Sequence, residues 1–333
     1  MTAQRSARLE LVCPAGTPAS LRAAVEAGAD SVYCGFQDET NARNFPGLNF
    51  TPEEMREAID FAHRRDARVL VAINTFPRAG AEALWHRAVD TAAALQADAV
   101  ILADLGLLAY TVERHPQLRR HLSVQAAAAN ADAIRFYVDS FDVKRVVLPR
   151  VLTVQEIAAI NAEVACETEV FVFGGLCVMA EGRCALSSYA TGRSPNMNGV
   201  CSPASHVRYS EEGGDLVSKL GEFTIDRVPR DEPAPYPTLC KGCFSVGGRR
   251  GHVFEDPASL DAAALIGQLG QSGVTALKIE GRQRSRSYTK AVVASFRRAA
   301  DAYAEGRPIP AGELRRLSEG QSTTAGAYRK TWR

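Results

Sequence analysis

Short apolar segments alternate with longer amphipathic segments along most of the chain, and this alternation predicts parallel strands joined by helices. Eight segments rich in Val, Ile and Leu are the expected strands: Leu9–Cys13, Ser31–Cys34, Val69–Ile73, Ala99–Leu102, Leu122–Gln125, Arg145–Leu148, Glu169–Phe173 and Ala276–Ile279. Eight strands, each followed by a helix, predict an α/β fold of the (β/α)8 TIM-like barrel type. A doubly wound open sheet is the rival, but the strand count and the lack of a glycine-rich phosphate loop after the first strand favour the barrel.

Three of the intervening helices have clear signatures in the sequence. Thr51 with Glu54, and Thr153 with Glu156, form capping boxes that predict two helix starts. After the eighth expected strand, apolar residues recur at helical spacing over positions 288–303. A stripe of this kind is typical of a helix that packs on a core.

The spacing of these units is regular except between the seventh and eighth expected strands, where residues 176–256 intervene. We therefore expect residues 1–333 to form a single (β/α)8-like domain in which residues 176–256 are an insertion. Loops that follow barrel strands lie at the C-terminal face, where barrel enzymes have their active sites. The insertion is accordingly expected to cover the mouth of the barrel.

Composition and charge narrow the class of protein. The chain has 333 residues, of which 46% are hydrophobic and 23% charged, as in an ordinary globular protein, and its formal net charge is +1. A net charge this close to zero provides no overall excess of Lys and Arg for binding nucleic acid. The start lacks the apolar stretch of a signal peptide, and the longest apolar run, residues 99–112, is too short to cross a bilayer. We expect a cytoplasmic protein without a transmembrane segment, whose cysteines are thiols or metal ligands.

Four of the eight cysteines lie in the insertion at the spacing C-x6-C-x16-C-x38-C, namely Cys177, Cys184, Cys201 and Cys240. The spacing differs from the paired knuckles usual for structural zinc, whereas an iron–sulfur cluster accepts dispersed thiolates. Spacing alone leaves a cluster, a zinc site and buried thiols open. Cys243 adds a CxxC pair that suits zinc or redox chemistry. Small buried hydrophobes are the expected state of the other three cysteines, Cys13, Cys34 and Cys166.

Polar residues follow several expected strands, at the end of the barrel where catalytic and binding residues usually lie. They are Asn74, Asp104, Gln125, Arg150, Glu280 and Arg282, together with Asn41, Arg43 and Asn44 in the long loop after the second strand. The alternative for each is a helix cap or a salt bridge. Together they predict a partly cationic pocket in which Arg43, Arg150 and Arg282 clamp a small carboxylate, as the planar guanidinium favours.

The segment from Phe173 to Cys177, continued by Gly182-Arg183-Cys184 and Ser187, resembles the signature of the collagenase-like peptidases of unknown catalytic type. The likeness extends over nearly the whole chain. It is supported by residues 11–16, 40–50, 72–76, 147–152 and 278–285. Within that family the chain is similar to the branch that acts in ubiquinone biosynthesis.

The resemblance implies a function and a cofactor. Cys177, Cys184, Cys201 and Cys240 match the family cysteines that hold a [4Fe–4S] cluster, and Cys243 departs from that pattern. Members of this branch pair with a homologous UbiV-like subunit and hydroxylate a prenylated ubiquinone precursor without dioxygen. Prephenate, the oxygen donor of related members, would suit the predicted clamp. The expected substrate-binding residues are Arg43, Asn44, Asn74, Gln125, Arg150, Glu280 and Arg282, whereas no catalytic residue is assigned.

Three other functions were weighed against this one. Other branches hydroxylate RNA bases, but the near-neutral charge and the lack of a substantial domain after the barrel argue against nucleic acid. A non-catalytic scaffold whose cluster is structural stays open. Proteolysis is not supported, because the six histidines form no H-E-x-x-H pair and no nucleophile–base–orienter set is evident.

Overall fold

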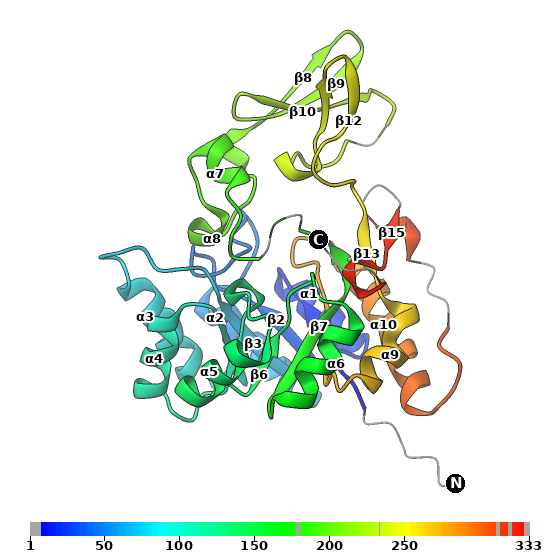
Figure 1. Cartoon of the computed structure of the whole chain (residues 1–333). Coiled ribbons are helices and arrows are strands. Elements are labelled where there is room, and N and C mark those ends of the chain that lie inside the picture. The colour runs from blue at the N-terminus through cyan, green and yellow to red at the C-terminus, as the bar shows by residue number, and fades with distance from the viewer. Residues whose placement is uncertain are drawn as a thin grey trace.

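Eight parallel strands form a closed barrel in the computed structural model, which describes residues 8–177, 179, 181–232, 234–310, 314–318 and 322–329. The strands are β1 (Glu10–Pro14), β2 (Ser31–Cys34), β3 (Arg68–Ile73), β4 (Ala99–Leu102), β5 (Arg120–Leu122), β6 (Arg145–Val147), β7 (Glu167–Gly175) and β14 (Ala276–Ile279). The last strand, β14, pairs in parallel with both β1 and β7, and this double pairing closes the barrel. The predicted TIM-like fold is confirmed (Figure 1).

Helices surround the barrel, as Figure 1 shows. They are α1 (Pro18–Glu26), α2 (Pro52–His63), α3 (Ala83–Ala94), α4 (Leu105–Arg114), α5 (Ala131–Phe141), α6 (Val154–Glu163), α9 (Ile266–Gln271) and α10 (Arg286–Ala304). Both predicted capping boxes are present: the side chains of Thr51 and Thr153 accept from the backbone of Glu54 and Glu156, which reach back to the cap. Each box satisfies backbone donors that the first helical turn leaves free. In the described part of the chain, no helix is both long and apolar enough to span a bilayer.

The core has two layers because side chains alternate across each strand. Residues such as Leu11, Val32 and Val71 point outward and pack against the helices. A smaller apolar cluster, which includes Val12 and Leu70, belongs to the opposite side of the same strands and fills the middle of the barrel. The predicted strands are therefore apolar on both faces, as parallel strands usually are.

The fifth strand differs from its prediction, which was Leu122–Gln125. It runs over Arg120–Leu122, and the chain then leaves the sheet at Ser123, whose hydroxyl caps a 3-10 turn over Val124–Ala126. Gln125 thus lies in the loop beyond the strand and not in the strand itself. The turn ends at Ala127, which has the left-handed φ of 53°.

The segment between β7 and β14 forms structure of its own above the C-terminal end of the barrel (Figure 1). It contains α7 (Leu186–Thr191), α8 (Pro195–Asn198), an antiparallel sheet of β8 (Val207–Glu212), β9 (Asp215–Leu220) and β10 (Phe223–Pro229), and a hairpin of β11 (Cys243–Val246) and β12 (Arg249–His252). The chain then returns as β13 (Ser259–Asp261), antiparallel to β7, and β15 (Thr323–Thr324) lies beside β13. After β13 the chain forms a 3-10 turn over Ala263–Leu265 and continues into α9.

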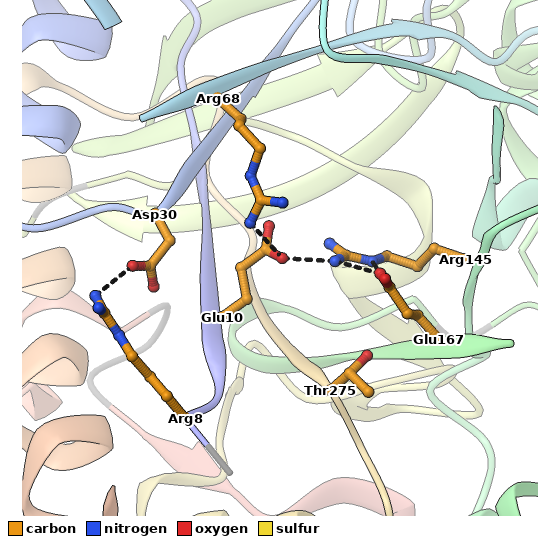
Figure 2. A pocket seen from close by; sticks show the side chains of 7 residues that line it. All are labelled: Arg8, Glu10, Asp30, Arg68, Arg145, Glu167 and Thr275. Atoms are coloured by element: carbon orange, nitrogen blue, oxygen red, sulfur yellow. Dashed lines mark hydrogen bonds and ion pairs between the residues drawn. The ribbon is translucent and has the colours of Figure 1, made fainter. Parts of the chain in front are cut away.

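At the opposite end, the floor of the barrel is built from ion pairs. A cavity of about 330 Å³ lies there. Figure 2 shows the charged side chains that line it and pair with one another. Arg145, whose side chain is only 3% exposed, lies 2.5 Å from Glu10, 2.6 Å from Glu167 and 3.3 Å from Glu169. Lys278 lies 2.5 Å from the other oxygen of Glu169. Because these buried charges are matched and lie far from the mouth, we assign them to stability.

Candidate functional site

Three separate parts of the insertion bring the four candidate cysteines over the barrel mouth. Cys177 follows β7, Cys184 precedes α7, Cys201 follows α8, and Cys240 lies in a 3-10 turn over Leu239–Lys241. Burial, opposed by Arg43 and reinforced by the other three thiols, raises the pKa of Cys201 to about 11. Burial also raises the pKa of Cys240, with contributions from Cys177 and Cys184. The four thiols therefore lie close enough to repel one another once they ionise.

This donor set fits an iron–sulfur cluster in its chemistry. The thiols of Cys201 and Cys240, whose pKa values are raised, stay protonated unless a bound cation compensates their charge, and metal binding does this by displacing the protons. Among the described residues, no group of three or more Cys, His, Asp or Glu side chains has the arrangement of a site for one metal ion. A cluster spreads its irons over the corners of a larger cage, so it accepts thiolates that lie farther apart.

Two glycines let the cysteine segments pack directly on the loops of the barrel. Gly182, with a φ of +74°, comes so close to the carbonyl of Gln125 that a Cβ would lie 2.0 Å from its oxygen. Gly199, with a φ of +75°, would bring a Cβ within 2.2 Å of the carbonyl oxygen of Asn41. Only glycine combines a positive φ with such an approach. The backbone N–H of Asn44 also donates to Gly199, at 3.2 Å.

Polar side chains inside the insertion hold the cysteine backbone. The amide of Asn196 donates to the carbonyl of Cys184 at 3.2 Å, and the buried hydroxyl of Ser187 donates to the carbonyl of Cys201. Tyr236 donates from its hydroxyl to Ser202, one residue farther on, at 2.8 Å. These bonds fix the backbone around two of the four thiols.

The three arginines predicted to form a carboxylate clamp have different partners. Arg150 donates from Nε to Glu181 and from Nη1 to the carbonyl of Gly175, each at 2.8 Å. Arg43 lies 3.5 Å from Glu280. Arg150 is therefore neutralised by a carboxylate of the cysteine segment, and Arg43 has a longer contact to a carboxylate at the end of the eighth strand.

Arg282 is the exception. It is 4% exposed, and its Nη1 donates to the side-chain oxygen of Asn41 at 3.2 Å, while no carboxylate of the described residues lies in ion-pair contact with it. Its guanidinium lies 5.7 Å from the ring centroid of Tyr33. Burial lowers the pKa of Arg282 to about 10, so the group stays charged at neutral pH at a desolvation cost that a carboxylate ligand would offset.

The other predicted residues lie in the loops around these arginines. Asn74 accepts from the backbone of Ala42 at 2.9 Å and donates to Ser123 at 3.2 Å, so it ties the loops after β2 and β5 together. Asn44 acts through its backbone contact with the insertion. Gln125 keeps a buried side-chain oxygen that accepts no bond from the described residues. Asp104 is a helix cap, because its carboxylate accepts from the first turn of α4.

Sequence reasoning missed two residues of the site. Glu181, which neutralises Arg150, lies between Cys177 and Cys184 in the sequence, but only the folded chain shows its partner. Tyr33 points into the barrel from β2, where its ring also lies 3.9 Å from Nζ of Lys278. Its hydroxyl donates to the carbonyl of Ile279 at 2.9 Å. The alternation of side chains along β2 was the available signal for Tyr33.

The family model of peptidase family U32 matches residues 16–329. The tRNA hydroxylation protein P of Escherichia coli is 32% identical over 326 residues, which cover 92% of this chain and 71% of that protein. The 23S rRNA 5-hydroxycytidine C2501 synthase of the same organism is 30% identical, over 95% of this chain and 42% of its own length. Among solved structures, the U32 peptidase Mk0906 aligns over 52% of this chain and 72% of its own, with 18% identity and a TM-score of 0.42.

Proposed function

Since the chain belongs to peptidase family U32, we propose that it is the iron–sulfur subunit of a hydroxylase that works without dioxygen. The observation that carries the proposal is the convergence of four cysteine thiols on an arginine-lined barrel mouth. Two relatives from Escherichia coli that are named for RNA hydroxylation or hydroxycytidine synthesis support hydroxylation as the reaction. Hydrolysis of peptides is not proposed, because the Ser–His contact of the insertion, Ser205 with His206 at 3.0 Å, joins adjacent residues of the chain and not residues of the arginine-lined site.

Cys177, Cys184, Cys201 and Cys240 would hold a [4Fe–4S] cluster, which supplies single-electron transfer when it is bound. The residues of the chain would do the rest of the binding work. Arg282 would bind a carboxylate of the oxygen donor, because it is a buried cation with no carboxylate partner among the described residues. Glu181 and Glu280 would hold Arg150 and Arg43 in place beside it. A dicarboxylate such as prephenate suits a pocket with this surplus of positive charge.

The substrate we propose is a prenylated ubiquinone precursor. The alternative of RNA needs a cationic surface that follows the phosphate backbone. Residues 176–256, which cover the mouth, contain nine Lys or Arg and ten Asp or Glu, so their charges cancel. A segment with almost no net charge suits a neutral aromatic ring better than a polyanion.

We also propose a homologous, UbiV-like partner subunit. Of the nine large hydrophobic side chains that are exposed in the described part of the chain, seven lie in residues 176–256. Tyr189, which is 78% exposed, lies 5.6 Å from the ring of Phe223. Aromatic residues gathered on one exposed segment are typical of a protein interface.

Anaerobic purification with a co-expressed UbiV-like protein tests the proposal. We expect a 1:1 complex with about four irons and four sulfides per copy of this chain, since four thiolates suit one cubane cluster. Replacing any of Cys177, Cys184, Cys201 or Cys240 by Ala should remove the iron. Cys34→Ala and Cys166→Ala are the matched controls and should keep it. Zinc in place of iron and sulfide under strict anaerobiosis would refute the cluster.

RNA-base hydroxylation is the second candidate, and the names of the two Escherichia coli relatives favour it. The two functions separate in a deletion strain grown without oxygen. Loss of ubiquinone with unchanged nucleosides supports the first function. Loss of a hydroxylated nucleoside with normal ubiquinone supports the second, and RNA that co-purifies with the complex would point the same way.

A further inference from the structure

Arg43 lies between the predicted donor pocket and the four cysteines. Its guanidinium approaches Glu280 at 3.5 Å and donates to the carbonyl of Ala42 at 2.7 Å. Its side chain is 27% exposed, so it lies at the boundary of the buried pocket and is not enclosed like Arg282. The charges of Glu280, Cys201 and Cys177 all act on it, in that order after burial.

Hydrogen bonds on two sides connect Arg43 and its neighbours to the segments that carry Cys201 and Cys177. On one side, the N–H of the next residue, Asn44, donates to Gly199 at 3.2 Å, two positions before Cys201. On the other side, Glu280 accepts from the N–H of Gly175 at 3.3 Å, two positions before Cys177. Arg43 and Glu280 therefore form a bridge between two of the three segments that carry the cysteines.

A permanent positive charge beside a cluster favours the state with the extra electron, because reduction adds negative charge. A carboxylate at the same place has the opposite effect. The contact between Arg43 and Glu280 is longer than the 2.7–2.9 Å of a tight charge-assisted bond, which leaves the arginine free to meet a second carboxylate.

We propose that Arg43 is a donor-binding residue that couples the donor site to the four-cysteine centre: its charge raises the reduction potential of the cluster, and a carboxylate donor that binds to it lowers that potential. The inference rests on the proposed function, since it requires the cluster. It adds a residue-level link between donor binding and electron transfer. By linkage, the donor binds more tightly to the oxidised cluster than to the reduced one.

The test is a redox titration of the anaerobic complex, with dithionite as reductant and ferricyanide as oxidant, followed by electron paramagnetic resonance. Arg43→Gln should shift the midpoint potential to a lower value, and Arg43→Lys should restore most of it because the charge is kept. Arg282→Gln is the matched control: it removes a cation near Arg43 that, unlike Arg43, is not among the leading charges that act on Cys201. We expect its shift to be clearly smaller.

Glu280→Gln provides a second measurement if Arg43→Gln loses iron. Removal of the opposing carboxylate should shift the potential upward. Adding prephenate should lower the potential of the wild-type complex and leave that of Arg43→Gln unchanged. Iron-loaded Arg43→Gln with the wild-type potential, or Glu280→Gln without a shift, would overturn the proposal. Wild-type protein without iron would instead refute the proposed function. Failure of the Arg43 proposal and failure of the proposed function therefore give different results.

Discussion

A buried guanidinium without a carboxylate partner is unusual, because the desolvation of an isolated charge costs far more than a hydrogen bond returns. Arg282 has such a position: Asn41 supplies a neutral acceptor, and the ring of Tyr33 supplies a weaker electrostatic contact. Natural proteins keep a cost of this kind mostly where a ligand removes it. Arg282 therefore marks the place in the barrel where the binding of an anion would be most favourable in free energy.

Arg282→Ala is expected to abolish anaerobic ubiquinone synthesis while the cluster and the partner complex are kept. A charge-assisted contact contributes about 1.5–3 kcal/mol, so the KM for the oxygen donor should rise by roughly 10- to 150-fold in an in vitro assay. Since the change removes a charge that burial disfavours, the melting temperature should stay the same or rise.

Arg282→Lys is the matched control for charge, and it should recover part of the donor affinity but not the bidentate geometry. Normal ubiquinone synthesis in an Arg282→Ala strain would show that the residue is structural. The donor would then bind elsewhere on the barrel or on the partner.

The packing of the cysteine segment against the loops of the barrel depends on Gly182. Gly182→Ala should lower the iron content strongly, because its Cβ would lie 2.0 Å from the Gln125 carbonyl at a φ of +74°. The barrel should keep its far-ultraviolet circular dichroism. Iron analysis and circular dichroism on the same anaerobic sample measure both effects.

Gly192→Ala separates the clash from the backbone strain. Gly192 has a φ of +69°, but a Cβ there would meet no atom within 4 Å. It should therefore cost about 1 kcal/mol of strain without loss of iron. Equal iron loss in both variants would mean that strain in the insertion, and not the contact with the barrel, controls assembly.

The ion pairs of the barrel floor predict a pH-dependent stability. Burial raises the pKa of Glu10, but Arg145, Ser31 and Arg68 outweigh it and hold the pKa below the usual 4.5. The unfolded chain therefore binds this proton more readily, so the stabilisation is present above pH 4.5 and is lost as the pH falls through the folded pKa. Glu10→Gln leaves Arg145 paired with Glu167 and Glu169 but removes one charged partner, and should cost about 1.5–3 kcal/mol at pH 7.

Thermal unfolding at pH 7 and at pH 3.5 measures this effect, and the difference between Glu10→Gln and wild type should shrink at the lower pH. Asp132→Asn is the control, because Asp132 pairs with Arg135 at the surface with its side chain 90% exposed. A surface pair of this kind contributes at most about 1 kcal/mol. A Glu10→Gln protein as stable as Asp132→Asn would contradict the structural role of the floor.

Seven of the eight barrel strands could be placed closely from the sequence, because strands buried on both faces read as continuous apolar runs. The fifth strand, Arg120–Leu122, could not be placed in this way, because the polar His121 interrupts the apolar run. His121 points into the barrel, where the side chain of Arg119 donates a hydrogen bond to it. The strands of the insertion were also missed. β8, for example, is largely exposed and lacks the apolar alternation of a half-buried strand.

The candidate site was predictable to the extent that it depends on strand ends. Arg43, Arg150, Glu280 and Arg282 were chosen by position, and the structure brings them to one mouth. Which arginine is neutralised, and by which carboxylate, depends on contacts between distant segments, such as Arg150 with Glu181. The four cysteines could be picked out from their positions in the insertion, but their assignment to a cluster rests on the family resemblance, because spacing alone left zinc and buried thiols open.

At the scale of the whole molecule, the insertion is where we expect the partner to bind. Tyr189→Ser with Phe223→Ser should weaken the complex with a UbiV-like subunit by at least tenfold, since aromatic anchors dominate such interfaces. The iron content should be unchanged. Phe136→Ser is the control, because Phe136 is 52% exposed but lies on the barrel helix α5. Sedimentation of the co-expressed subunits measures both, and equal weakening would place the interface elsewhere.

The closing seam of the barrel has a consequence for biosynthesis. The last strand, β14, completes the ring by pairing with β1 at one edge and β7 at the other, so Glu10 meets Ala276. On the ribosome, the first seven strands therefore emerge as an open sheet with two unpaired edges, which are prone to aggregation. The long insertion adds little to the equilibrium cost of closure, because doubling a loop costs only about 0.6 kcal/mol, but it delays the moment at which closure is possible. All four candidate ligands are thus synthesised before the mouth they cover exists, and a nascent chain that stalls before residue 276 carries its thiols on an unfinished barrel.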